Sequence, residues 1–449
     1  METIVLSAQG CGLETGSTDI RLGDRSEFSA VYLLETNGDF ERVAETIAGE
    51  QSCGTFTKLP FETEELRARA RARVVSLTPL EGSNEPTYRS AFLERRDQRS
   101  PARRAHLEIA FPTENVGPNL PTLLATIAGN LFELGEVTGI KLLDIDLPAN
   151  FAAGFAGPGY GVTGTRRLVG VPSGPVIGTI IKPSVGLSVE DTAAIVDTLC
   201  DAGIDFIKDD ELLANPPHSP LAERIAAVMP VIEKHADRLG RKVMFAFNVS
   251  GSVDHMRRSH DLILKNGGTC IMVSLNWVGH SGVDDLRRHS ELPIHGHRNG
   301  WGMFTRSDAL GMAYTAYQKI WRLAGVDHMH VNGIDSKFWE PNDSVIESAN
   351  ACLAPFAGLS PVMPVFSSGQ WGGQAPATYS ALQSTDLMYL AGGGIFAHPD
   401  GLAAGVKALR EAWDAAVASA ELDRYAESHP ALASALRTFR PRDTKGASA

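Results

Sequence analysis

The stretch GIDFIKDDE (residues 203–211) begins like an apolar strand and ends in a lysine followed by three acidic residues. Side chains of an extended chain alternate between two faces, so Lys208 and Asp210 would share the face of Ile204 and Phe206. Burying a lysine beside carboxylates costs free energy unless the charges are paired. The stretch therefore predicts a buried strand that carries a charged functional site at its carboxyl end.

Seven further short apolar stretches lie between residues 175 and 395, with amphipathic helical sequence between them. They read PVIGTIIKP, KVMFAFNVS, TCIMVSLN, LPIHGHR, DHMHVNG, VMPVFSSG and LMYLAGGGI. Eight strands, each followed by a helix, favour a closed (β/α)8 TIM barrel over the alternative of an open, doubly wound sheet. The glycines of YLAGGGI lack the spacing of a dinucleotide-binding fingerprint.

The first 150 residues follow a different pattern. Strand-like sequence at 29–36, 72–80 and 104–112 alternates with helical sequence at 39–51 and 120–135. This order predicts an N-terminal α+β domain of the ferredoxin-like kind, residues 1–150. The barrel would then occupy residues 151–449, including a C-terminal helical extension.

The composition excludes several classes of function. The chain has 449 residues, 43% of them hydrophobic, and a net charge of −12, which argues against a nucleic-acid or anionic-membrane partner. Its arginine-rich stretches at 66–73 and 95–104 are interpreted as solvated faces or loops. Five scattered cysteines, no signal peptide and no apolar run of spanning length predict a cytoplasmic protein.

Polar residues follow seven of the eight predicted barrel strands, where such barrels hold their active sites. Asp210 and Glu211 offer the hard oxygen ligands that Mg²⁺ prefers, and Arg298 suits a bidentate grip on phosphate. Lys182 and His297 are candidates for proton transfer. Together these groups predict metal-assisted removal of a proton beside a carbonyl, with the enolate stabilised by the metal.

These residues carry a resemblance. The strand-end motifs resemble, in order, the active-site motifs of the ribulose-bisphosphate carboxylase (RuBisCO) large subunit: GTIIKPSVGLS, DFIKDDE, HGHRNGWG, DHMHVNG with KFWE, PVFSSG and AGGGIFAHPDG. The segments EQSCGTF and IAGNLF extend the similarity into the first domain. The resemblance implies that Lys208 reacts with CO2 to form a carbamate. The carbamate would then bind Mg²⁺ together with Asp210 and Glu211.

The resemblance also implies roles for other residues. Lys182, His297 and the mobile-loop Lys337 would be catalytic beside Lys208. The substrate, a small phosphorylated sugar, would be bound by Arg298, His330, Ser367, Gly369, Gly392 and Gly393. A homodimer with shared active sites is implied, in which the neighbouring chain supplies Glu50, Thr55 and Asn130.

Departures from the carboxylase pattern point to the RuBisCO-like proteins, form IV, and to the branch of photosynthetic sulfur bacteria and proteobacteria. Ser184 stands where carboxylases have lysine, Phe56 where they have tryptophan, and Ser368 where they have glycine; Trp301 and Gly302 lie near the place of a further histidine. The resemblance then implies isomerisation or tautomerisation of a keto-sugar phosphate, or decarboxylation or carboxyl transfer of a 3-oxo sugar-acid phosphate of the isoapionate route. The alternatives are a genuine carboxylase and a non-catalytic, sulfur- or stress-related dimeric scaffold.

Overall fold

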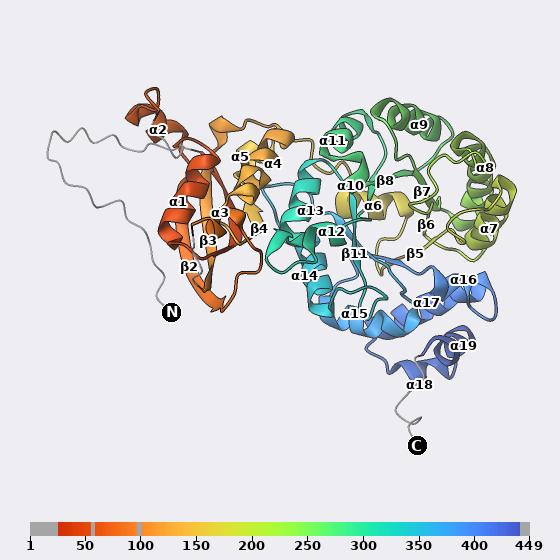
Figure 1. Cartoon of the computed structure of the whole chain (residues 1–449). Helices are drawn as coiled ribbons and strands as arrows, with labels where there is room; N and C mark the ends of the chain where they lie inside the picture. The colour runs from red at the N-terminus through yellow and green to blue at the C-terminus, as the bar shows by residue number, and fades with distance from the viewer. Residues whose placement is uncertain (1–25, 55–58, 97–100, 441–449) are drawn as a thin grey trace, which may run out of the picture. The chain divides into compact units, whose positions relative to one another are not determined.

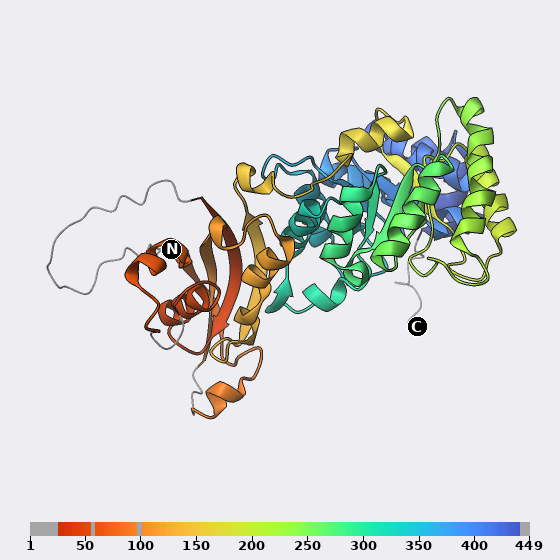
Figure 2. The same ribbon diagram turned by 90° about the horizontal axis from the view of Figure 1, so that it is seen from above.

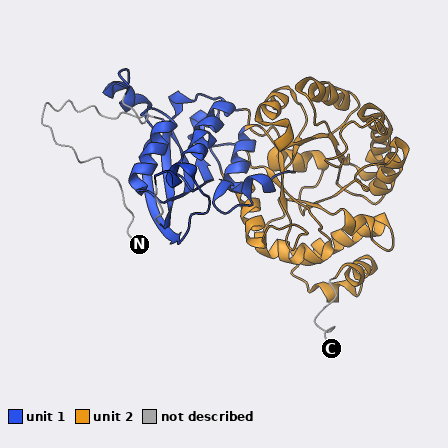
Figure 3. Ribbon diagram, in the orientation of Figure 1, with its two compact units in different colours: residues 1–155, 300–323, 356–359 blue, residues 156–299, 324–355, 360–449 orange. Residues whose placement is uncertain are grey.

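The structure is a computed structural model that describes residues 26–54, 59–96 and 101–440. Two compact units are distinguished in it (Figure 3). The first contains the described residues up to Phe155 together with Gly300–Leu323 and Phe356–Leu359. The second contains Ala156–Asn299, Ala324–Pro355 and the described residues from Ser360 onward. A boundary near residue 150 stays a prediction.

The described part of the first unit is built on a five-stranded sheet with the order β10-β4-β1-β3-β2. The strands are β1 Glu27–Thr36, β2 Arg73–Ser83, β3 Ala102–Pro112, β4 Gly139–Asp146 and β10 Leu310–Met312. Strand β1 pairs antiparallel with both β3 and β4, and β2 pairs antiparallel with β3. The order β4-β1-β3-β2 is that of a ferredoxin-like fold, as predicted.

Helices connect these strands. The unit contains α1 Phe40–Glu50, α2 Glu64–Ala70, α3 Ala91–Glu94, η1 Thr113–Asn115, α4 Leu120–Ala128, η2 Asn130–Glu133, α5 Ala149–Ala152, α12 Gly302–Thr305 and α13 Tyr314–Leu323. Helix α1 starts where the Asp39 side chain accepts a hydrogen bond from Arg42 N–H, and it buries Phe40, Val43 and Ile47. The helix is therefore held by its apolar face rather than by its sequence propensity alone.

The second unit contains the barrel. Within the described residues, eight parallel strands close in the order β11-β12-β13-β5-β6-β7-β8-β9. Their bounds are β5 Val176–Ile180, β6 Phe206–Lys208, β7 Met244–Asn248, β8 Cys270–Ser274, β9 Ile294–His297, β11 His328–Asn332, β12 Met363–Phe366 and β13 Met388–Leu390. All eight predicted strands are present, and the closed barrel is confirmed.

The barrel strands are buried on both faces, as expected of a parallel sheet covered by helices. Figures 1 and 2 show helices around the strands. These are α6 Gly161–Val169, α7 Val189–Asp201, α8 Leu221–Leu239, α9 Val253–Lys265, α10 Leu275–Val278, α11 His280–His289, α14 Asn342–Leu353, η3 Gly372–Gln374, α15 Ala375–Leu382, α16 Gly393–Phe396 and α17 Leu402–Val417. The C-terminal extension follows as α18 Leu422–Ala426 and α19 Pro430–Phe439. None of the helices in the described ranges combines the length and the apolar character needed to cross a bilayer.

Candidate active site at the carboxyl ends of the barrel strands

The predicted barrel residues gather at one rim, because parallel strands end on the same side. Lys208, His297 and Asn332 are the last residues of β6, β9 and β11. Lys182 lies two residues after β5, Ser367 directly after β12, and Gly392 two residues after β13. These polar residues are therefore positioned by the barrel strands themselves rather than by long loops.

Lys208 is completely buried among acidic residues. Its ammonium nitrogen lies 2.7 Å from the carbonyl oxygen of Asp209 and 3.6 Å from Glu211 Oε2. Burial lowers the pKa of Lys208, while the charges of Glu211, Asp210 and Asp209 oppose that shift. The net shift is toward the neutral amine, which is the form that reacts with CO2.

Asp209 has a structural task that separates it from its two neighbours. Its carboxylate forms a buried ion pair of 3.0 Å with Arg224 and accepts the backbone N–H of Asn248. The Asn248 side-chain amide donates in turn to the carbonyl oxygens of Asp210, at 3.1 Å, and Glu211, at 3.2 Å. The barrel thereby fixes the backbone that presents Asp210 and Glu211.

Lys182 extends over this acidic group. Its ammonium donates to Asp210 Oδ2 at 2.7 Å and to Ser184 Oγ at 2.8 Å. A Cβ atom placed on Gly392 would lie 3.6 Å from Lys182 Cε, so the lysine stem runs directly beside that glycine. The structure therefore brings together Lys182, Ser184, Asp210 and Gly392.

His297 is a neutral imidazole with one defined tautomer. Burial, and then the charge of Lys208, lower its pKa to about 4. Its Nδ1 accepts the Asn299 N–H at 3.2 Å, which leaves the proton on Nε2, 3.4 Å from Glu211 Oε2. His297 thus presents an N–H toward the carboxylate group, and the His330 ring lies 4.4 Å away between centroids.

Arg298 is paired inside the protein. Its guanidinium forms an ion pair with Glu340, and both side chains are almost fully buried. Glu340 also accepts hydrogen bonds from Asn332 Nδ2 and from Ser344 Oγ, the latter at 2.9 Å. Sequence reasoning missed Glu340, although it lies within the quoted segment KFWE. A phosphate contact for Arg298 stays a prediction.

The backbone is strained at two neighbouring strand ends. Asn332, with φ 67°, and Ser368, with φ 72°, both adopt the left-handed conformation that favours glycine. Ser368 Oγ donates to Asn332 Oδ1 at 3.0 Å, which ties the two positions together. Such strain costs about 1–3 kcal/mol for each residue and is concentrated at functional sites.

A cavity of about 610 Å³ connects the rim to the C-terminal extension. Three predicted site residues line it, Lys337, Gly369 and Gly393, and Phe439 and Arg440 form another part of its wall. The Lys337 N–H donates to the Ser368 carbonyl oxygen at 3.1 Å, which places the backbone of Lys337 beside the end of β12. The extension therefore encloses part of the candidate site.

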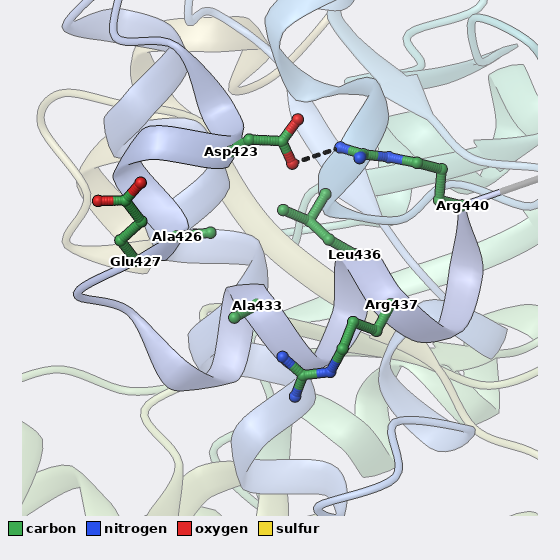
Figure 4. A pocket seen from close by; sticks show the side chains of 7 residues that line it. All are labelled: Asp423, Ala426, Glu427, Ala433, Leu436, Arg437 and Arg440. Carbon is green, nitrogen blue, oxygen red and sulfur yellow. Dashed lines mark hydrogen bonds and ion pairs between the residues drawn. The ribbon is translucent and has the colours of Figure 1, made fainter.

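A separate hollow of about 470 Å³ lies between α18 and α19 (Figure 4). It shares Leu436 and Arg440 with the larger cavity. Arg440 also forms a 2.7 Å ion pair with Asp423, so the end of α19 is held to α18. None of the predicted site residues lines this hollow.

The predicted residues of the first unit lie apart from the barrel in sequence. Glu50 is the last residue of α1 and lines a pocket of about 280 Å³ with Arg67 and Arg71. Asn130 begins η2 and is exposed. Thr55 and Phe56 lie outside the described residues.

One further cluster has metal-ligand chemistry. His260, Asp261 and His289 bring one ligand atom each within 4.8 Å of one another on α9 and α11. His260 Nε2, however, accepts the Glu291 N–H at 3.1 Å, so the proton lies on Nδ1, which donates to Asp261 at 3.0 Å. This nitrogen has no free lone pair, and the cluster is a hydrogen-bonded group of the buried His260 with the more exposed Asp261 and His289.

Two family models match the chain. Residues 161–439 match the catalytic domain, and residues 23–151 the N-terminal domain, of the ribulose bisphosphate carboxylase large chain. The chain belongs to the RuBisCO large-chain family. The matches cover both units and confirm the resemblance deduced from the active-site motifs.

Relatives place the chain more narrowly within the family. It is 54% identical to "3-oxo-isoapionate-4-phosphate transcarboxylase/hydrolase" of Xanthobacter autotrophicus, over 92% of this chain and 99% of the relative. A "3-oxo-isoapionate-4-phosphate decarboxylase" of Rhizobium rhizogenes is 47% identical, over 93% and 99%. The crystal structure of a RuBisCO-like protein from Burkholderia fungorum has a TM-score of 0.87 and 50% identity, covering 92% of this chain and all of that one. The chain is a RuBisCO-like enzyme, as predicted.

Proposed function

We propose that the protein breaks the bond to the carboxylate of a phosphorylated 3-oxo sugar acid, of the 3-oxo-isoapionate 4-phosphate type, through an enolate. The observation that carries this proposal is the convergence of Lys182, Asp210 and Glu211 beside a buried Lys208, in a chain 54% identical to an enzyme named for that substrate. The expectation of a RuBisCO-like reaction other than CO2 fixation agrees with the names of both relatives.

The chemistry of a 3-oxo acid suits this site. When the bond between the carboxylate carbon and its neighbour breaks, CO2 leaves and the electron pair moves toward the ketone to form an enolate. The neighbouring carbon then takes up a proton. A site for this reaction needs positive charge beside the developing oxyanion and a positioned proton donor. Lys182 offers both in one ammonium group, held by Asp210 and Ser184.

Family membership supports a Mg²⁺ site, and the residues present fit one. Asp210 and Glu211 supply hard oxygen ligands. Addition of CO2 to the neutral amine of Lys208 forms an N–C bond, releases a proton and gives a carbamate that supplies a third. Bound there, Mg²⁺ would stabilise the negative charge of an enolate oxygen. Lys182 and Ser184 would keep their places beside Asp210, and the neutral His297 would present its Nε2–H from β9.

The phosphate would lie in the cavity beside the C-terminal extension. Lys337 supplies a positive charge there, and Gly369 and Gly393 let backbone N–H groups approach an anion closely. A Cβ atom on Gly393 would meet no other atom within 4 Å, so this part of the cavity is open to a ligand.

We further propose a homodimer whose active sites are shared between chains. Large apolar side chains are exposed in the segments that follow the barrel strands, on the side of the candidate site; among them are Val185, Leu212, Val253, Trp277 and Phe338. Apolar surface at the end of the barrel that holds the site favours coverage by another chain. Glu50, Thr55 and Asn130 of the partner would then complete the site.

The experiment is a turnover assay with 3-oxo-isoapionate 4-phosphate that carries ¹³C in its carboxylate. Decarboxylation releases the label as CO2 in a one-to-one ratio to substrate consumed. A second candidate, carboxyl transfer followed by hydrolysis, is favoured by the 54% identity to the transcarboxylase/hydrolase and retains the label in an organic product. Absence of any reaction with Mg²⁺ and bicarbonate present would refute both.

A further inference from the structure

A column of three buried imidazoles runs along the inside of the barrel. His328 Nδ1 lies 3.3 Å from His295 Nδ1, and His295 Nε2 lies 2.8 Å from His330 Nε2. At one end, His328 Nε2 is 2.8 Å from Thr165 Oγ1; at the other, His330 Nδ1 is 3.0 Å from Ser367 Oγ. The column therefore links helix α6 to a residue of the candidate site.

Both nitrogens of each imidazole are used within the column. Burial lowers the pKa of His328 to about 3 and holds the pKa values of His295 and His330 well below the ordinary range. A neutral imidazole has one donor and one acceptor nitrogen. Neutral rings joined in this way can therefore form a continuous chain only if all hydrogen bonds point in the same direction.

Thr165 sets that direction. Its hydroxyl donates to the Gly161 carbonyl oxygen at 2.5 Å, so its oxygen must accept the proton of His328 Nε2. His328 Nδ1 is then an acceptor, and His295 donates to it from Nδ1.

The same logic continues to the site. His295 Nε2 accepts from His330 Nε2–H, which leaves His330 Nδ1 as an acceptor for the Ser367 hydroxyl. Ser367 thus has its hydrogen turned into the barrel and its oxygen lone pairs left for a ligand.

We infer that Thr165, His328 and His295 are positioning residues that fix the tautomer of His330 and the direction of the Ser367 hydroxyl. The neighbouring Ser368 hydroxyl is committed as well, because it donates to Asn332 Oδ1. The oxygens of Ser367 and Ser368 lie 3.4 Å apart and form an acceptor pair. Such a pair selects a hydrogen-bond donor of the substrate and repels an oxyanion.

Reversal of the column provides the test. Thr165→Val has nearly the same shape but removes the hydroxyl that accepts from His328. A proton on His328 Nε2 then has no acceptor, so the direction of all hydrogen bonds in the column can reverse. The reversal would put the proton of His330 on Nδ1, and Ser367 would accept a hydrogen bond from it. Thr165→Ser retains the hydroxyl and is the matched control.

Neutron diffraction from perdeuterated crystals gives the direct readout. We expect deuterium on Nε2 of His330 in the wild type and in Thr165→Ser, and on Nδ1 in Thr165→Val. Deuterium on His330 Nδ1 in the wild type overturns the assigned direction. An unchanged proton position in Thr165→Val overturns the role of Thr165. If Thr165→Val does not fold, the wild-type map still decides the direction.

The kinetic readout rests on the proposed function. With the 3-oxo acid phosphate as substrate, Thr165→Val should lower kcat/KM by about 10- to 100-fold, mainly through KM, since one acceptor contact is replaced by a competing donor. Thr165→Ser should restore the wild-type KM. A lower kcat with unchanged KM would indicate a merely structural role and contradict the inference. If the proposed function were wrong, the wild type too would be inactive on this substrate, and the neutron maps would still test the column.

Discussion

The ammonium of Lys182 and the carboxylate of Asp210 form an ion pair of 2.7 Å at the ends of adjacent barrel strands. Burial alone would raise the pKa of Asp210, but the hydrogen bond from Lys182 and the charge of Lys208 lower it. Asp210 is therefore ionised at neutral pH and holds the lysine that we propose as proton donor. The same carboxylate is a proposed metal ligand, so one residue couples the two parts of the site.

The substitution Lys182→Met separates proton transfer by Lys182 from metal binding by Asp210. It removes the proton donor and should lower turnover by about 10²- to 10⁴-fold. It also removes a cation from Asp210, so Mg²⁺ affinity should not fall. Turnover and Mg²⁺-dependent deuterium exchange beside the carbonyl measure the first effect, and calorimetric titration with Mg²⁺ the second. Wild-type exchange rates in this variant would rule out Lys182 as the proton-transfer group.

Activation by CO2 should depend on Lys208. Incubation with bicarbonate and Mg²⁺ should raise activity, and ¹³C-labelled bicarbonate should add a carbamate signal to the carbon NMR spectrum. Lys208→Ala should lose that signal and at least about 100-fold of activity, because a metal ligand is removed. Lys234→Ala, which changes an exposed lysine of α8, is the matched control and should keep both. A fully active Lys208→Ala enzyme would contradict the carbamate.

The barrel was accessible from sequence because its strands are short, continuous apolar runs, each followed by polar residues at a shared rim. Strand β10 could not be predicted from the sequence, because it has only three residues and pairs with a distant strand, β4. That pairing joins residues 310–312 to 140–142. No local pattern encodes such a contact. The pairing of Arg298 with Glu340 was missed for the same reason, as 42 residues separate the two partners.

Shared active sites can be tested by complementation. A site in the proposed dimer combines Asn130 of one chain with Lys208 of the other. Mixing Asn130→Ala with Lys208→Ala should give half heterodimers, each with one intact site, and so about a quarter of wild-type activity. Mixing Lys208→Ala with Lys182→Met should restore nothing, because both residues belong to the barrel and no intact site forms. Equal results from the two mixtures, or an active monomer in sedimentation, would exclude the shared site.

The buried histidines should make the protein sensitive to mild acid. The pKa values of His328 and His297 are lowered to about 3 and about 4, from about 6.5 in an unfolded chain. Between these values the unfolded state binds more protons, so the free energy of unfolding falls as pH falls, by up to about 1.4 kcal/mol per pH unit for each histidine. The pKa of Asp209, raised by burial, acts in the opposite direction.

Urea denaturation at pH 7.5, 6.5 and 5.5 measures this slope. His328→Gln should reduce it by up to about 1.4 kcal/mol per pH unit, since one suppressed protonation is removed. His106→Gln, at an exposed position of β3, is the matched control. An identical slope in the wild type and His328→Gln would show that His328 is not held neutral by the fold.

The enzyme should not fix CO2 on ribulose bisphosphate. Carboxylases of this family have a lysine where this chain has Ser184, and here the Ser184 hydroxyl accepts a hydrogen bond from Lys182 instead of adding a second cation. Loss of one charged hydrogen-bond partner costs about 1.5–3 kcal/mol, or roughly 10- to 150-fold in rate if the contact is made in the transition state. Proton transfer should survive, because Lys182, Asp210 and His297 are in place. We therefore expect no incorporation of labelled CO2 with ribulose bisphosphate, measured beside a genuine carboxylase under the same Mg²⁺ and bicarbonate. Substantial incorporation by the wild type would show that Ser184 does not prevent carboxylation and that the enzyme is a genuine carboxylase.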